Sequence, residues 1–160
     1  VVAIIGILAA VGVVAYNGYT KAARINVVKS NLQSVSKFIS AELYKCIIGD
    51  KISTWSGSTG IDGSAPFTVV QRDCDTSENL FLQNAGYAFL VFSEDLENFP
   101  NPFNPNDNNG GFKWDSDPPE PEYIGRVSCG QKSGDNFISC YGRWGSGEND
   151  YDTIKINNPF

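Results

Sequence analysis

Two apolar patterns follow one another at the start of the chain. Residues 1–16 read VVAIIGILAAVGVVAY and contain neither a charge nor a proline. At a rise of 1.5 Å per residue, a helix of this length spans about 24 Å, slightly less than the ~30 Å hydrocarbon core of a bilayer. The run therefore predicts a membrane-spanning helix or a helix buried in an assembly. A signal peptide fits less well, because the run has no basic start and leads without a break into the next pattern. The opening valine suggests a processed or truncated start.

The second pattern is one face of an amphipathic helix. Between residues 21 and 48, apolar side chains recur at steps of three or four, at Ile25, Val28, Leu32, Val35, Ile39, Leu43 and Cys46. No proline interrupts residues 1–48, so we expect one continuous helix of about 70 Å. It should end near Gly49, which suits a C-terminal cap. Gly6, Gly12 and Gly18 are its predicted weak points, and a local bend or unwinding is expected at Gly12 or Gly18.

The remaining residues alternate between short apolar runs and turn-forming stretches. The sequence predicts a loop at 52–66, a strand at 67–72, one or two helical turns at 76–82, and a central strand at 86–92, GYAFLVF. A long surface loop is expected at 98–121, which holds most of the prolines, followed by strands at 123–129, 136–143 and 153–156. These elements predict an α+β fold, with a long N-terminal α-helix packed against a small antiparallel β-sheet.

Two parts of the chain follow from these patterns. Residues 1–24 form a hydrophobic membrane or assembly segment, and residues 25–160 form the amphipathic half of the helix together with a globular head. The charge follows the same division. Residues before Asp50 hold five basic groups and one acidic group, whereas the rest hold seven basic and 17 acidic groups, for net charges of +4 and −10. This asymmetry favours contacts between the head of one copy and the shaft of another, although solvation of one helix face explains the basic residues equally well.

The cysteines predict disulfides rather than a metal centre. They are Cys46, Cys74, Cys129 and Cys140, with no CxxC spacing, and the chain has no histidine, which excludes a Cys/His metal site. A tight turn at Gly134 and Asp135 would place Cys129 directly opposite Cys140 on neighbouring strands, within bonding reach. We therefore predict bonds between Cys129 and Cys140 and, from the remaining pair, between Cys46 and Cys74.

Few residues point to a ligand or to catalysis. In the loop at 98–121, Asp107, Asp115 and Asp117 are candidate calcium ligands, but no EF-hand spacing is present and these residue types also form turns. Without histidine, Ser–His and Cys–His catalytic pairs are excluded. Carboxylate pairs such as Glu94 with Glu97 are common on acidic surfaces. We predict a protein that is not an enzyme and has no cofactor, and the acidic head disfavours nucleic acid as a partner.

The opening residues resemble a known family. VVAIIGILAAV followed by AYNGYTKAA is similar to the mature N-terminus of bacterial type IV pilins and type II secretion pseudopilins, over roughly the first 25 residues. In that family the motif FTLIEL precedes this run, and many members carry a proline shortly after ILAA. Here the FTLIEL residues are not in the sequence, and Val14 stands at the equivalent place of the proline, which leaves Gly12 as the candidate for a flexible point.

The resemblance implies a life history in two stages. The subunit is first anchored in the inner membrane and processed by a prepilin peptidase, with methylation of the new N-terminal phenylalanine. The pilus assembly machinery then packs it into a helical filament of identical subunits, with an assembly core at Val1, Val2, Ile4, Ile5, Gly6, Ile7, Leu8, Ala9, Ala10 and Gly12. Small residues there permit close approach of helices.

The expected function is therefore that of a structural subunit. It is a major pilin of an extracellular type IV pilus used for adhesion, twitching motility or DNA uptake. A pseudopilin of a type II secretion system is the alternative within the resemblance. A membrane-tethered monomeric binding module is the alternative from another class, and it needs no repeated contacts between copies.

Overall fold

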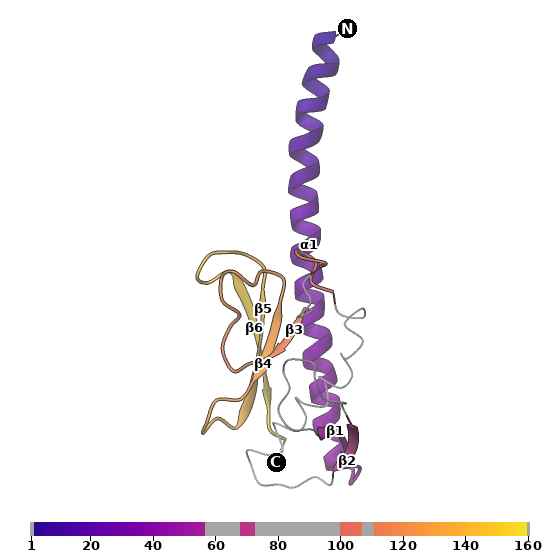
Figure 1. Cartoon of the computed structure of the whole chain (residues 1–160), viewed down its shortest axis with the longest axis vertical. Coiled ribbons are helices and arrows are strands. Elements are labelled where there is room, and N and C mark those ends of the chain that lie inside the picture. The colour runs from indigo at the N-terminus through magenta and orange to yellow at the C-terminus, as the bar shows by residue number, and fades with distance from the viewer. Residues whose placement is uncertain (1, 57–67, 73–99, 107–110, 160) are drawn as a thin grey trace.

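The long N-terminal helix dominates the computed structural model, which describes residues 2–56, 68–72, 100–106 and 111–159 (Figure 1). Helix α1 runs over Val2–Ile47. The strands are β1 (Ile52–Ser56), β2 (Thr68–Arg72), β3 (Phe112–Trp114), β4 (Val127–Gly130), β5 (Phe137–Arg143) and β6 (Tyr151–Asn157). The chain thus has the predicted α+β class, with the first half of α1 projecting away from the strands.

Helix α1 buries the predicted stripe. Val28, Leu32, Val35, Ile39, Leu43 and Cys46 are all buried, and Ile25 is half-buried where the stripe begins. The helix continues through Gly12 and Gly18 without interruption, so the unwinding expected at these glycines is absent here. Only the second half of α1 has one apolar face and one polar face, and its apolar face packs in the core.

The C-terminal end of α1 is the predicted glycine cap. Gly49 has a φ of 79°, its amide donates to the carbonyl of Cys46 at 3.2 Å, and the Asp50 amide donates to the carbonyl of Lys45 at 3.0 Å. This pair of hydrogen bonds is the Schellman motif, and it requires a residue that tolerates the left-handed conformation. The helix therefore ends where the sequence predicted.

The main sheet is mixed rather than wholly antiparallel. Its strand order is β3-β4-β5-β6, with antiparallel pairing of β4 with β5 and of β5 with β6. Strand β3 pairs in parallel with β4, with Phe112 opposite Val127. Prolines and asparagines surround the three residues of β3 and indicate a loop. The prediction of a loop over the whole of 98–121 is therefore wrong at β3.

A second correction concerns the residues after the helix. The stretch 52–66 was predicted to be a loop, but its first part forms β1, which pairs antiparallel with β2 from Ile52 opposite Arg72 to Ser56 opposite Thr68. Strand β2 was predicted within one residue of its bounds. The β-branched and aromatic residues of ISTWS suit a strand once a partner is available, and this outweighs the serine content that indicated a loop.

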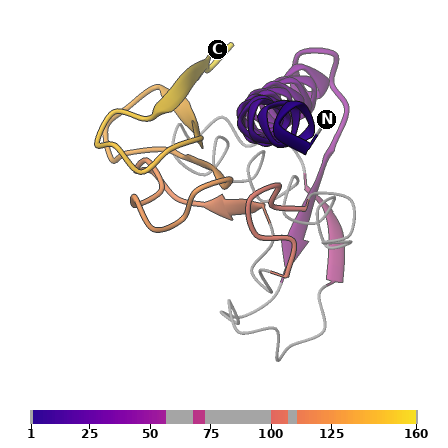
Figure 2. The ribbon, with the colours of Figure 1, turned by 90° about the horizontal axis from the view of Figure 1, so that it is seen from above.

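The core lies between α1 and the inner face of the main sheet (Figure 2). Val127 and Cys129 of β4, Ile138 and Cys140 of β5, and Ile156 of β6 form one buried cluster with the stripe of α1. Cys129 and Cys140 face each other in the β4–β5 register, with Cα atoms 4.1 Å apart, and are disulfide-bonded. The first predicted disulfide and the hairpin register behind it are confirmed.

Close approach of helix and sheet depends on one glycine. A Cβ atom at Gly142 of β5 would lie 3.2 Å from Cβ of Leu32 and 3.3 Å from Cγ1 of Val28. Gly142 therefore lets α1 lie directly on the sheet at the top of the core, because a larger residue would push the two elements apart.

The opposite face of the sheet is covered by the segment 115–121, called here the outer loop. The Ser128 hydroxyl donates to the carbonyl of Asp117 at 2.9 Å, and Nε of Arg143 donates to the carbonyl of Pro119. Gly130 leaves the room for this crossing, because a Cβ there would lie 2.4 Å from the backbone of Asp115. The sheet is thus held between α1 on one side and the outer loop on the other.

Several predictions fall outside the described residues. These are the helical turns at 76–82, the central strand at 86–92, the calcium candidate Asp107 and the disulfide partner Cys74. Cys46 is itself disulfide-bonded, so none of the three described cysteines is free. The bond from Cys46 to Cys74 stays a prediction, which non-reducing peptide mapping would test.

Candidate functional site

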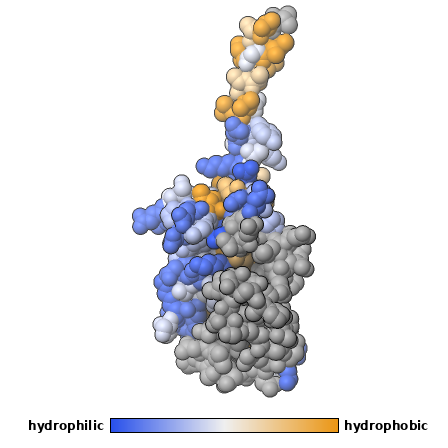
Figure 3. Space-filling view, in the orientation of Figure 1, coloured by the Kyte–Doolittle hydropathy of each residue, from blue (hydrophilic) through white to orange (hydrophobic). Residues whose placement is uncertain are grey.

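The exposed first half of α1 is the most unusual surface of the molecule. Val2 is 85% exposed, and Ile4, Ile5, Ile7 and Leu8 are each more than 60% exposed. Further along, Val11, Val13 and Val14 are exposed to the same degree. Soluble monomers rarely expose a continuous apolar surface of this size, and such surfaces mark contacts with a protein or a membrane. Figure 3 shows the apolar colouring concentrated at the projecting end of the molecule.

The predicted assembly residues all lie on this segment, the first half of α1. Val2, Ile4, Ile5, Gly6, Ile7, Leu8, Ala9, Ala10 and Gly12 are helical and exposed, and Val1 falls outside the described residues. A Cβ at Gly6 or Gly12 would meet nothing within 4 Å. No part of the described head therefore covers these glycines. Because they have no side chain, the backbone of a neighbouring helix can approach closely there.

The segment also meets the length and composition of a membrane span. Helix α1 is the one described helix long and apolar enough to cross a membrane, and its most apolar stretch is entirely unburied. A core helix of a soluble protein would pass the same test of length and composition, but it would be mostly buried. The exposure of this stretch makes membrane anchoring compatible with the fold.

A polar zone separates the apolar segment from the head. Tyr16 and Tyr19 are 68% and 75% exposed, and the exposed Lys21 and Arg24 follow them. The guanidinium of Arg24 lies 5.9 Å from the ring centre of Phe103, in the described segment 100–106. The first fully buried helix residue is Val28. Val28 lies nine residues, or about two and a half helical turns, beyond Tyr19.

Two ion pairs involve basic residues of the helix, one with the head and one within the helix itself. Nζ of Lys29 lies 3.1 Å from Oδ2 of Asp152 on β6 and 5.7 Å from the ring centre of Trp144. Nζ of Lys45 contacts the buried carboxylate of Glu42. The pair Lys29–Asp152 is about half exposed, so it contributes little to stability, but it shows that a basic helix residue and an acidic head residue are complementary.

The two described calcium candidates, Asp115 and Asp117, are each paired with a lysine. Oδ2 of Asp115 accepts from Nζ of Lys113 at 2.8 Å, and Oδ1 of Asp117 accepts from Nζ of Lys132 at 2.8 Å. Burial raises the pKa of Asp115, but hydrogen bonds from Lys113 and the Asp117 amide outweigh it and leave the pKa below its usual 3.8. The hydrogen bond to Asp117 raises the pKa of Lys132. No group of three metal-binding side chains occurs among the described residues.

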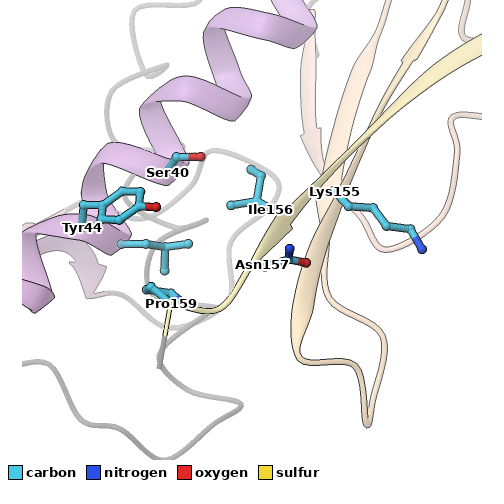
Figure 4. Close-up of a pocket in the computed structure, with 7 residues that line it drawn as sticks. Ser40, Tyr44, Lys155, Ile156, Asn157 and Pro159 are labelled. Atoms are coloured by element: carbon cyan, nitrogen blue, oxygen red, sulfur yellow. The ribbon is translucent and has the colours of Figure 1, made fainter.

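A small cavity of about 210 Å³ lies between the lower part of α1 and β6 (Figure 4). Its described lining is Ser40, Leu43, Tyr44, Lys155, Ile156, Asn157 and Pro159. Ile156 points toward the helix, whereas Lys155 points away across the sheet, where its Nζ lies 4.5 Å from the ring centre of Phe137. The described lining therefore offers hydroxyls and apolar surface, but no acid–base pair.

Two buried charged residues, Arg143 of β5 and Glu42 of α1, were not predicted from the sequence. Arg143 is only 3% exposed, and its guanidinium also donates to the carbonyls of Gly145, Gly147 and Glu148. Glu42 is buried on the head-facing side of α1, and among the described residues its Oε2 has no hydrogen-bond partner. A charged residue in a strand or helix is normally solvated, so the sequence carried no signal for either position.

No family model, curated protein or solved structure matches this chain. The resemblance to pilins therefore rests on the opening residues of the sequence. The long N-terminal helix packed on a small sheet is compatible with a pilin-like architecture.

Proposed function

We propose that this chain is a structural, non-enzymatic subunit that polymerises into a helical filament of the type IV pilus kind on the cell surface. The observation that carries the proposal is the continuous helix α1, which buries one half in a folded head and leaves the other half apolar and exposed. An exposed helix of this composition is stable when it is surrounded by lipid or by identical helices. Both environments occur in the life history that the resemblance implies.

The two halves of α1 have separate roles in this proposal. The first half anchors the subunit in the inner membrane and later packs in the filament core, where Gly6 and Ala9 let helices approach closely. The second half holds the head on the filament surface. The acidic head and the basic residues of the helix provide complementary surfaces between successive copies, as the pair between Lys29 and Asp152 does within one copy.

Electron microscopy of sheared surface material tests the polymer. We expect helical fibres that contain this chain, identified by mass spectrometry of the fibre fraction. Fibres without this chain, or its recovery only as a membrane-bound monomer, would reject the proposal in favour of a tethered binding module.

A substitution at Gly6 tests close helix packing. Gly6→Phe adds a large side chain where a Cβ meets nothing within the subunit, so the fold of the head should be unchanged. In a filament core the same side chain would force helices apart, and fibre yield should fall by about tenfold or more. The matched control is Ile7→Phe, which exchanges one bulky apolar side chain for another at the next position. Equal fibre yields from the two variants would contradict close approach at Gly6.

A further inference from the structure

Four exposed side chains lie at the boundary of the apolar segment. Tyr16 and Tyr19 are followed within one or two turns by Lys21 and Arg24, and all four are exposed. Tyrosines are enriched where a membrane-spanning helix leaves the hydrocarbon, because the ring is apolar and its hydroxyl is wet. Near the end of a membrane-spanning helix, lysine and arginine side chains keep their own apolar stems against the hydrocarbon and place their charged groups among the lipid headgroups.

The end of the apolar run places these side chains at one membrane surface. The apolar run ends at Tyr16, and the first charged residue, Lys21, follows five residues or about 7.5 Å further along the helix axis. Tyr16 and Tyr19 then lie at the edge of the hydrocarbon, and Lys21 and Arg24 lie at the depth of the phosphates. In Figure 3 a hydrophilic band follows the apolar tip before the head widens.

The electrostatics of this zone favour anionic lipid. Helix α1 contains no acidic residue before Glu42, so nothing on the helix itself neutralises Lys21 or Arg24. Lys29, the next basic residue, is already paired with Asp152. The rise from Lys21 to Val28 is about 10 Å, close to one Debye length at physiological ionic strength. Lys21 therefore lies about one Debye length from the first fully buried residue of the helix, whereas Arg24 lies against the head at Phe103.

We propose that Lys21 and Arg24 form a binding site for anionic phospholipid headgroups, which fixes the depth of α1 while the subunit resides in the membrane. The Lys21 ammonium and the Arg24 guanidinium donate charge-assisted hydrogen bonds to phosphodiester oxygens. Phe103 holds the Arg24 guanidinium beside the head, so this site also fixes the height of the head above the membrane. The inference rests on the membrane stage of the proposed function. An acidic head of a second copy is the competing partner, but it would not account for the tyrosines at the hydrocarbon edge.

Spin-labelled lipids in reconstituted vesicles test this site. The full chain is placed in phosphatidylcholine vesicles with trace spin-labelled phosphatidylglycerol or phosphatidylcholine, and the protein-bound fraction of each label is measured. We expect several-fold preference for phosphatidylglycerol at low salt, which disappears near 1 M salt. Lys21→Gln and Arg24→Gln should each lower this preference by up to about fivefold. The exchange Lys21→Arg with Arg24→Lys should retain it.

Control variants and a second measurement separate the possible outcomes. Lys37→Gln and Lys45→Gln change basic residues on the part of α1 that carries the head, and both should keep the preference. Equal binding of the two labels by the wild type, or an unchanged preference in Lys21→Gln/Arg24→Gln, would overturn the headgroup site while leaving the membrane stage intact. If neither label is bound, the membrane stage fails and the headgroup site fails with it. The second measurement is cross-linking between copies. If Lys21→Gln/Arg24→Gln keeps its lipid preference but loses this cross-linking, Lys21 and Arg24 bind a second subunit instead.

Discussion

At the scale of single residues, Gly142 decides how closely the helix and the sheet pack. Gly142→Ala would place a methyl group 3.2 to 3.3 Å from atoms of Leu32 and Val28, on rigid elements that cannot both move away. We expect a loss of about 1–3 kcal/mol in the free energy of unfolding, measured by thermal denaturation of the detergent-solubilised chain. Gly18→Ala is the matched control. It lies on exposed helix with open space around it, and it should leave stability unchanged or raise it by up to ~1 kcal/mol. Equal effects of the two substitutions would contradict this account.

Asp115 gives the outer loop a dependence on acid. Because its pKa is below the usual 3.8 in the folded chain, its ionised form stabilises the fold above that value. This contribution is lost as the pH falls through the lower, folded pKa. Asp115→Asn should therefore lower the melting temperature at neutral pH, and the difference from the wild type should shrink below about pH 4. A difference that persists undiminished at low pH would show that the carboxylate charge is not the cause.

The ion pair between Lys132 and Asp117 of the outer loop has the opposite dependence on pH. The pKa of Lys132 is raised above 10.5 by its hydrogen bond to Asp117, so any stabilisation is complete below 10.5 and is lost at higher pH. Lys132 and Asp117 are both more than half exposed, and a pair of this kind contributes little. The two ion pairs therefore lose their contributions at opposite ends of the pH scale, and both contributions are present near neutrality.

At the scale of elements, the outer loop depends on Arg143 of β5. This buried guanidinium donates to the carbonyl of Pro119 and to three carbonyls between β5 and β6. Arg143→Met keeps the apolar stem but removes every donor, so the four carbonyls lose this hydrogen-bond partner. We expect a loss on the order of 3 kcal/mol in the free energy of unfolding, measured by denaturant titration. Lys132→Met, which removes the exposed contact of the same loop, is the control and should change stability little. A similar loss in both variants would show that the position of the loop, rather than the buried donors, matters.

The elements also show how far sequence patterns reach. The helix was predictable because a period of three to four residues persists over more than five turns, and its end was predictable because Gly49 adopts a conformation that favours glycine. The β4–β5 register followed from the position of one turn between Cys129 and Cys140. Strand β3 was not predictable, because its three residues carry almost no pattern and its parallel pairing depends on contacts made by the whole outer loop.

The candidate site was predictable from the sequence only in part. The apolar segment was visible in the sequence, since its composition alone requires an apolar environment. The burial of Arg143 and Glu42 was not visible, because neither residue type nor spacing indicates which charged side chain the tertiary structure will enclose. The contact of Arg24 with Phe103 joins segments almost 80 residues apart, and only the fold brings them together.

At the scale of the whole molecule, the structure is a folded head joined to a helix half that contributes almost nothing to it. Residues 2–24 are exposed except for the half-buried Thr20, and the one described contact of this part with the head is that between Arg24 and Phe103. The core begins at Ile25 and Val28. Helix α1 therefore starts to bury its side chains directly after residue 24.

Deleting residues 1–24 should consequently convert the chain into a soluble, folded monomer. An exposed cation–π contact is a small loss, so we expect the melting temperature to change by no more than about 4 °C. Light scattering should give a monomer, and circular dichroism should retain the strand signal. Deleting residues 1–31 is the control, because it also removes Val28 and Lys29, which contact Gly142 and Asp152 on the sheet. That deletion should destabilise the head strongly. If the shorter deletion already unfolds the head, the first half of α1 has a structural role within the subunit, and its exposed apolar surface does not exist solely for lipid or for other copies.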